Sequence, residues 1–202
     1  MPQQKIVLFA SGSGSNAQAI IDYFEGNPSV RIAALFSNKP DAYALQRAKK
    51  HAIQANYFTR DEFRNGEVLK QLRQVNPDLI VLAGFLWLVP AEIVEAFPVK
   101  IINIHPALLP KYGGKGMHGH HVHEAVVANG EKQSGLTIHF VNNEYDKGNF
   151  ILQAFCPLQP NDNAEKLAAR ILKLEHFYLP RAIEQLLQNQ RENQQVTNNN
   201  QQ

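Results

Sequence analysis

Two polar side chains interrupt an otherwise apolar segment, residues 101–106 (Ile-Ile-Asn-Ile-His-Pro). Asn103 and His105 are two residues apart, so on a β-strand they point to one face while Ile102 and Ile104 point to the other. An asparagine N–H can stabilise an oxyanion, and a histidine can exchange protons near neutral pH. The pair therefore suits attack of an amine on a carbonyl carbon. The alternative is a pair of buried polar groups with ordinary hydrogen bonds.

Asp146 is the best candidate for a carboxylate that would act with this histidine. A carboxylate close to an imidazole raises the pKa of the ring and holds it as imidazolium. Asp146 also stands two residues before Gly148, and Asp followed closely by Gly is a common turn pattern. Taken alone, its sequence context favours an ordinary turn, so a catalytic role depends on proximity to His105.

A glycine-rich segment, residues 11–16 (Ser-Gly-Ser-Gly-Ser-Asn), follows the first apolar segment. Gly12 and Gly14 permit close approach to a ligand, and the N–H groups at a helix start favour a phosphate. A plain turn with a Ser or Asn cap is the alternative. Gly12, Gly14 and Ala17 also satisfy the dinucleotide-binding fingerprint. The acid that this fingerprint needs after the second strand is absent from residues 36–39 (Phe-Ser-Asn-Lys), so we expect a monophosphate rather than a nicotinamide cofactor.

Short apolar segments alternate with amphipathic ones through the first half of the chain. This rhythm predicts a Rossmann-like α/β fold, with a mostly parallel central sheet and helices on both faces. The glycine-rich segment and His105 both follow strands, at the carboxyl edge where such sheets bind ligands. The predicted strands are residues 5–10, 31–37, 54–58, 79–83 and 99–105, and the predicted helices are residues 16–26, 41–50, 67–75 and 90–97.

The pattern changes after His105. Residues 106–119 form a long loop rich in Gly and Pro, and loops of this length inside a compact domain are usually functional. The segments that follow predict one more helix, an antiparallel hairpin and a long final helix. These elements are residues 121–128, the strands 134–142 and 149–157, and residues 164–189.

Bulk composition narrows the class of protein. The 202-residue chain has 20 Lys and Arg against 18 Asp and Glu, and a net charge of +2 gives no electrostatic footprint for nucleic acid or an anionic membrane. The single cysteine, Cys156, excludes an internal disulfide framework and suits a reducing cytoplasm. The N-terminus lacks a signal-peptide pattern, and the longest apolar stretch is about half the ~20 residues of a membrane span. We therefore expect a cytoplasmic protein.

Four histidines, at positions 118, 120, 121 and 123, could be interpreted as a metal site. Only Glu124 adds an acid at helical spacing, and no cysteine completes a set of ligands. A glycine-rich loop that leads into an exposed helix explains most of these histidines as surface residues. We therefore expect no functional metal.

Together, these motifs resemble those of the phosphoribosylglycinamide formyltransferases, a folate-dependent formyltransferase family. The resemblance covers about residues 5–187. The string Asn-x-His-Pro-x-Leu-Leu-Pro at residues 103–110 is specific to folate-type formyl transfer, and the Gly-Ser-Asn loop narrows the resemblance to this family. The other matching segments are residues 82–85 (Leu-Ala-Gly-Phe), 134–141 (Ser-Gly-Leu-Thr-Ile-His-Phe-Val) and 146–148 (Asp-Lys-Gly).

The resemblance implies the formyltransferase fold and an enzyme that transfers the formyl group of 10-formyltetrahydrofolate to the amine of glycinamide ribonucleotide, a step of IMP synthesis. Asn103, His105 and Asp146 would be the catalytic set, with Asp146 keeping His105 protonated. It also implies only small-molecule partners, with no nucleic acid, membrane or metal, in a monomer or homodimer. Because Cys156 and the loop serines have no activating base in view, we predict direct attack by the amine without a covalent intermediate.

Binding residues also follow from the resemblance. The substrate phosphate and ribose would be held by Gly14, Ser15, Asn16, Leu172, Lys173, Leu174 and Glu175. The folate would contact Arg60, Leu86, Trp87, Leu88, Val89, Asn103, Asn142, Asn143, Glu144, Tyr145 and Asp146. The chain differs from the family pattern at Trp87, where a basic residue is frequent. Its loop at residues 111–118 is longer and richer in glycine, and we expect it to close over the substrate.

Three other functions share part of this pattern. A formyltetrahydrofolate hydrolase usually carries a domain before the first strand, and a methionyl-tRNA formyltransferase needs an RNA-binding domain after the catalytic one. We expect neither, because the sequence predicts one domain (residues 1–189) and a disordered Gln- and Asn-rich tail (190–202). Within the domain, residues 1–100 would bind phosphate and residues 101–189 would hold the catalytic and folate-binding groups. A non-enzymatic nucleotide-binding module would leave the Asn, His and Asp without a task.

Overall fold

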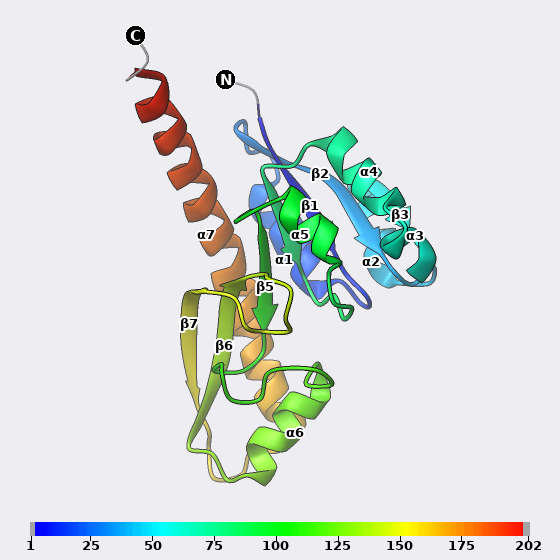
Figure 1. Cartoon of the computed structure of the whole chain (residues 1–202). Coiled ribbons are helices and arrows are strands. Elements are labelled where there is room, and N and C mark those ends of the chain that lie inside the picture. The colour runs from blue at the N-terminus through cyan, green and yellow to red at the C-terminus, as the bar shows by residue number, and fades with distance from the viewer. Residues whose placement is uncertain (1–2, 200–202) are drawn as a thin grey trace.

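A single seven-stranded sheet organises the chain, whose computed structural model describes residues 3–199 (Figure 1). The strand order is β3-β2-β1-β4-β5-β6-β7; the first five of these are parallel, and β6 and β7 are antiparallel to their neighbours. The strands are β1 (Gln4–Phe9), β2 (Val30–Ser37), β3 (Gln54–Tyr57), β4 (Leu79–Leu82), β5 (Ile101–His105), β6 (Gln133–Phe140) and β7 (Phe150–Pro157). The predicted Rossmann-like sheet with a C-terminal antiparallel hairpin is thus confirmed.

Helices cover both faces of this sheet. The helices are α1 (Ser15–Phe24), α2 (Tyr43–Lys50), α3 (Arg60–Arg64), α4 (Glu67–Val75), α5 (Ala91–Ala96), α6 (His120–Ala128) and α7 (Ala164–Asn199). Helix α3 is short, and the apolar periodicity of the sequence does not predict it. Its signal was a capping box, in which Thr59 and Glu62 bond to each other's backbone N–H.

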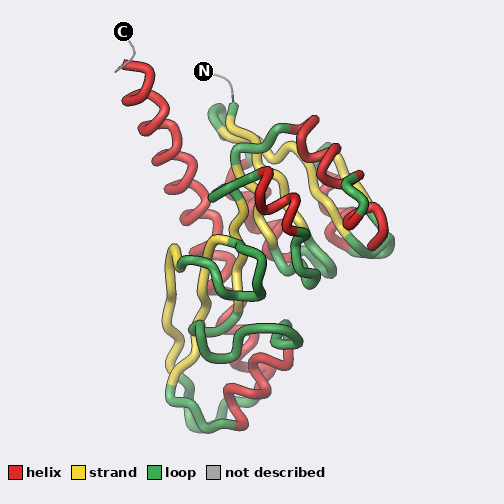
Figure 2. The backbone as a smooth tube through the Cα atoms, in the orientation of Figure 1, coloured by secondary structure: helices red, strands yellow, loops and turns green. Residues whose placement is uncertain are grey.

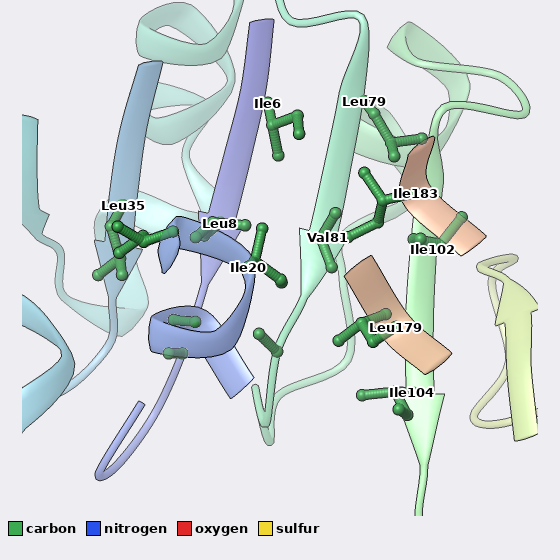
Figure 3. Packing of buried hydrophobic residues seen from close by; sticks show 14 of the residues in the cluster. Ile6, Leu8, Ile20, Leu35, Leu79, Val81, Ile102, Ile104, Leu179 and Ile183 are labelled. Atoms are coloured by element: carbon green, nitrogen blue, oxygen red, sulfur yellow. The ribbon is translucent and has the colours of Figure 1, made fainter. Parts of the chain in front are cut away.

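Alternating side chains of the strands build one core on each face. Ile6 and Leu8 of β1 pack with α1, α2 and α7, as do Ile102 and Ile104 of β5 (Figure 3). Val7 of β1 and its neighbours on the other face pack against α3, α4 and α5. Asn103 and His105 belong to this second face of β5, and they lie at the end of the strand, where the apolar core stops.

The final helix is longer than predicted. The sequence predicted disorder for residues 190–202, but α7 continues to Asn199, so this prediction is wrong for residues 190–199. Residues 200–202 lie outside the described residues. Gln, Glu and Arg favour a helix almost as well as Leu does, and the side chain of Gln190 reaches the carbonyl oxygen of Asp78 at 3.4 Å. Within residues 3–199, no helix combines the length and the apolarity that crossing a membrane requires.

Candidate active site

A cavity of about 740 Å³ opens where the parallel strands end. Its volume is in the range typical of small-molecule sites, and its position is the usual ligand-binding edge of an open α/β sheet. Figure 2 shows the loops that gather there, including the long connection from β5 to α6. The cavity is lined by the glycine-rich loop, residues 82–89 after β4, residues 103–106 of β5, residues 114–120 of the long loop, residues 144–146 and part of α7.

Asn103, His105 and Asp146 meet at this cavity, although Asp146 is about 40 residues from the other two. The Nδ1 atom of His105 lies 3.5 Å from Oδ2 of Asp146, and Nδ2 of Asn103 lies 3.4 Å from Oδ1. The side chains of His105 and Asp146 are 5% and 9% exposed. Gly114 donates its N–H to Asp146 Oδ2 at 2.9 Å. The carboxylate that sequence context alone assigned to a turn is therefore placed beside the imidazole.

The protonation of His105 differs from the expectation. We expected Asp146 to raise the pKa of His105 and keep the ring charged. Burial lowers that pKa more than Asp146 raises it, so the pKa of His105 lies below its ordinary value. Burial alone would raise the pKa of Asp146, but contacts with His139, His105 and the Gly114 N–H lower it overall. In the ligand-free site, Asp146 is ionised and His105 is neutral at neutral pH.

His139 is a fourth member of this cluster. It stands directly opposite Asn103 in the antiparallel pairing of β5 with β6. Its Nδ1 donates to the carbonyl oxygen of Phe140 at 2.8 Å, because a carbonyl can only accept. Its Nε2 lies 3.2 Å from Nδ2 of Asn103 and 3.4 Å from Oδ1 of Asp146, so the neutral ring accepts a hydrogen bond from the amide there and the protonated ring donates one to the carboxylate. A histidine within a predicted strand was the available signal, but only the register shows its partner.

The turn that carries Asp146 depends on a close approach at Gly148. A Cβ atom there would lie 1.7 Å from the carbonyl oxygen of Phe140, which is backbone and has little freedom to move. Gly148→Ala should therefore lower the free energy of unfolding by about 2 kcal/mol or more. Urea denaturation checks this, with Gly12→Ala as the control, because a Cβ at Gly12 meets nothing within 4 Å. Equal stabilities of the two variants would contradict the prediction.

The glycine-rich loop leads directly into α1. Gly14 precedes the helix in the left-handed region (φ 71°), and a Cβ there would lie 2.6 Å from the Cβ of Ala44. Gln18 N donates to Gly14 O, so the N–H groups of the first turn have no acceptor within the helix. Arg47 donates from Nε to the carbonyl oxygen of Ser13 at 2.9 Å and braces the loop. The loop has the free donors and the nearby cation that a phosphate requires.

The candidate substrate residues separate into two groups. Gly14, Ser15, Asn16, Leu172 and Glu175 line the cavity, whereas Lys173 and Leu174 do not. Lys173 is exposed, and Leu174 packs against the core. The buried carboxylate of Glu175 accepts a hydrogen bond from Nδ2 of Asn16 at 2.7 Å. Burial raises the pKa of Glu175 to about 7, although the Asn16 bond opposes the rise.

The candidate folate residues also divide. The cavity is lined by Leu86, Trp87, Leu88, Val89, Asn103, Glu144, Tyr145 and Asp146, but not by Arg60, Asn142 or Asn143. The Tyr145 hydroxyl accepts the Leu88 N–H at 3.0 Å and joins the two lining segments. The exposed Arg60 places its guanidinium 5.3 Å from the centre of the Trp87 ring, which ends a cluster of phenylalanines. Where the resemblance implied a frequent basic residue, Trp87 thus offers an aromatic surface that holds Arg60.

The four histidines of the long loop and α6 differ in their exposure, although the sequence predicts most of them to be surface residues. His118, His120 and His123 line the cavity, and His123 is buried rather than on the surface. Burial and, to a smaller extent, His120 lower the pKa of His123 to about 4. His121 pairs with Glu124 at 3.1 Å on the outside of α6. Among residues 3–199, no three His, Cys, Asp or Glu side chains come together as a metal site would require.

Comparison with known proteins gives one consistent family. The family model described as formyl transferase matches residues 4–183. The chain is 40% identical over 181 residues to a protein of Arabidopsis thaliana named phosphoribosylglycinamide formyltransferase, chloroplastic. That match includes 86% of this chain and 62% of the plant protein, so the chain spans about three fifths of the relative's length.

Bacterial relatives match over more of their length. The phosphoribosylglycinamide formyltransferase of Escherichia coli (strain K12) is 38% identical, across 88% of this chain and 84% of the relative. The crystal structure of phosphoribosylglycinamide formyltransferase from Anaplasma phagocytophilum superposes with a TM-score of 0.84 at 34% identity. It covers 93% of this chain and 88% of the solved one. Sequence and fold therefore agree over nearly the whole described chain.

Proposed function

Because this chain belongs to the formyl transferase family, we propose that it transfers the formyl group of 10-formyltetrahydrofolate to the amine of glycinamide ribonucleotide, a step of purine synthesis. The observation that carries the proposal is the convergence of Asn103, His105 and Asp146 on one cavity. The same cavity reaches the glycine-rich loop, so a phosphate bound there and a reacting amine near His105 could belong to one molecule.

The lining of the cavity suits the two substrates. The ribonucleotide phosphate would bind the N–H groups at the start of α1, and the ribose would lie beside Glu175. The flat pterin ring of the folate would lie between residues 86–89 and 144–146, where backbone groups and aromatic side chains face the cavity. Arg60, outside the cavity and held over Trp87, would meet a carboxylate of the folate tail. This arrangement brings the donor and acceptor together at β5.

Asn103 has the geometry to stabilise the developing oxyanion. When the amine nitrogen attacks the formyl carbon, a C–N bond forms and the carbonyl electron pair moves to oxygen. One N–H of Asn103 bonds to His139, which fixes the orientation of the amide. The other N–H makes only a long contact, 3.4 Å, with Asp146 and is available to the oxyanion in that fixed orientation. The intermediate collapses when the bond from the formyl carbon to the folate nitrogen breaks.

His105 would carry the proton between the two nitrogens. Its Nε2 donates to a backbone carbonyl, so the lone pair of the neutral ring is on Nδ1, beside Asp146. We propose that Nδ1 accepts the proton that the attacking amine loses, and that the folate nitrogen receives a proton as it leaves. The ionised Asp146 stabilises the imidazolium that forms in between. This assignment replaces the resting imidazolium that the sequence suggested.

Formyl transfer can be tested directly. The purified protein is mixed with 10-formyltetrahydrofolate and glycinamide ribonucleotide, and the formylated ribonucleotide and the deformylated folate are measured by mass spectrometry. Equal amounts of both products would support the proposal. Formate release that does not require the ribonucleotide would identify a hydrolase instead, and tight ribonucleotide binding without turnover would identify a binding module. A formylated protein trapped during turnover would contradict direct attack.

Glu175 should make ribonucleotide binding depend on pH. Its pKa is about 7 in the ligand-free site, so the group is protonated below that pH and ionised above it. If the carboxylate accepts hydrogen bonds from the ribose, ligand binding requires the ionised form, and the Kd for glycinamide ribonucleotide should rise about tenfold between pH 8 and pH 6. Isothermal titration calorimetry measures this.

The ribonucleotide phosphate also titrates in this range, so a matched variant is needed. Glu175→Gln keeps the size of the side chain and cannot ionise. Its Kd should retain only the pH dependence of the phosphate. Identical pH dependence in the two proteins would show that Glu175 does not bind the ribose as a carboxylate.

We place the reaction in the cytoplasm. Cys156 is buried and unpaired, which suits a reducing compartment. Fractionation of the native cells with an antibody to the protein would test this, and recovery with an oxidising compartment would contradict it.

A further inference from the structure

We infer that Tyr112 is a positioning residue whose backbone carbonyl fixes which nitrogen of His105 carries the proton; the inference rests on the role of His105 in the proposed function. The Nε2 atom of His105 lies 2.7 Å from the Tyr112 carbonyl oxygen. A carbonyl only accepts, so this contact requires hydrogen on Nε2. The basic lone pair is thereby kept on Nδ1, next to Asp146. Without the carbonyl, the neutral ring could place its hydrogen on Nδ1, facing the carboxylate, and lose its basic position there.

The backbone of Tyr112 needs help to present this carbonyl. Its φ is 58°, in the left-handed region that residues with side chains adopt rarely and at a cost. Glycine would reach this conformation freely, but the position holds a tyrosine. Some other interaction must therefore hold the residue in place.

The hydroxyl of Tyr112 supplies that interaction. It donates to Oε1 of Glu131 at 2.8 Å and accepts from Nδ2 of Asn129 at 3.0 Å. Lys111 contacts the same Glu131 oxygen at 2.9 Å. Asn129 and Glu131 follow α6, so the middle of the long loop is tied to the segment after that helix. The side chain thus anchors the strained backbone whose carbonyl oxygen contacts His105.

The same segment also contacts the partner of His105. Two residues after Tyr112, Gly114 donates its N–H to Oδ2 of Asp146, the oxygen that faces His105. A displacement of this segment would therefore disturb both the imidazole and the carboxylate. The ring of Tyr112 packs on the apolar cluster that contains Val126 and Ile171. Tyr112→Phe keeps this packing and removes only the hydroxyl.

Nitrogen NMR of ¹⁵N-labelled histidines tests the inference without reference to activity. At about pH 8, where an unperturbed histidine is neutral, His105 should show the Nε2–H tautomer alone, and Tyr112→Phe should show a mixture of both tautomers. With formyl-transfer substrates, kcat of Tyr112→Phe should fall about tenfold while both KM values stay within about twofold. Tyr57→Phe is the matched control, since Tyr57 is exposed on β3, and both readouts should equal those of the wild type.

A second variant covers a failure of Tyr112→Phe to fold. Asn129 is exposed, and Asn129→Ala removes one hydrogen bond to the same hydroxyl. We therefore expect a smaller fraction of the second tautomer and a smaller fall in kcat than in Tyr112→Phe. An unchanged His105 tautomer in the variants, or an unchanged kcat, would overturn the inference. If the wild type shows no formyl transfer, the proposed function fails, but the tautomer comparison still decides whether Tyr112 sets the proton position.

Discussion

Replacing Asp146 with asparagine is expected to lower kcat about 10³-fold and to change the KM of either substrate by less than about threefold. The carboxylate is ionised in the resting site and lies 3.5 Å from Nδ1 of His105. When His105 accepts the proton of the amine, a positive charge forms on a side chain that is only 5% exposed. An amide of the same shape does not neutralise that charge, and its N–H₂ group would face donors such as the Gly114 N–H. The loss therefore falls on the transition state rather than on binding.

The dependence of kcat on pH tests the direction in which Asp146 shifts the pKa of His105. Protonated His105 cannot act as a base, so kcat should fall as the pH drops through the pKa of His105, which lies below the ordinary value. Asp146 is the group that raises this pKa most strongly against burial. In Asp146→Asn, the acid limb of whatever activity remains should therefore move to lower pH.

Steady-state kinetics across a pH series measures both effects. Glu95→Gln, which removes a charge from the exposed surface of α5, is the control and should keep kcat within about twofold. Asp146→Asn with kcat within tenfold of the wild type would remove the carboxylate from the mechanism. A shift of the acid limb to higher pH would contradict the electrostatic role assigned to it.

Local patterns were sufficient to predict the scaffold of this site. Apolar strands with amphipathic segments between them implied parallel pairing, and that pairing places the ends of β1 and β5 at one edge. The two-residue spacing of Asn103 and His105 put both side chains on one face of a strand that ends at Pro106. These predictions hold because the alternation of side chains along a strand follows from local backbone geometry. The parallel topology follows from strands that are apolar on both faces.

The partners of these side chains could not be predicted in the same way. His139 meets Asn103 because β6 pairs antiparallel with β5 in one particular register, and a shift of one residue would point it to the other face. Tyr112 contacts His105 through a backbone carbonyl, a group that every residue possesses. No residue type in the sequence identifies such a contact. The proposed catalytic groups can therefore be identified from the sequence, whereas the groups that orient them can be identified only from the structure.

The charge state of His105 is a second feature that could not be predicted from the sequence. A neighbouring carboxylate does raise the pKa of the ring, as the sequence suggested, but the size of the opposing effect depends on burial. The imidazole is enclosed by the end of β5, by the long loop that follows it, and by the turn of the hairpin, which comes after α6 and β6 in the chain. The positions of these segments along the chain do not reveal how completely they enclose the ring. Only the structure therefore shows that the pKa of His105 is lowered overall.

His105→Ala should lower kcat by about 10³-fold, and added imidazole should restore part of the loss. The substitution removes the imidazole that we propose carries the proton, but it leaves Asp146 and Asn103 in position. The side chain lines a cavity of about 740 Å³, so a free imidazole can reach the space that the ring leaves. The ribonucleotide site that we propose, at the glycine-rich loop and Glu175, does not depend on this ring, so the Kd for the ribonucleotide should change by less than about threefold.

Rescue distinguishes a lost proton acceptor from a damaged fold. If His105 transfers protons, the rate with His105→Ala should rise with the concentration of neutral imidazole and should therefore increase with pH as the added imidazole deprotonates, near pH 7. In the double variant His105→Ala and Asp146→Asn, rescue should be weaker, because the rescuing imidazolium would lose its counter-charge. A wild-type rate in His105→Ala without imidazole would assign proton transfer to another group, and equal rescue with and without Asp146 would show that the carboxylate does not act through the imidazole.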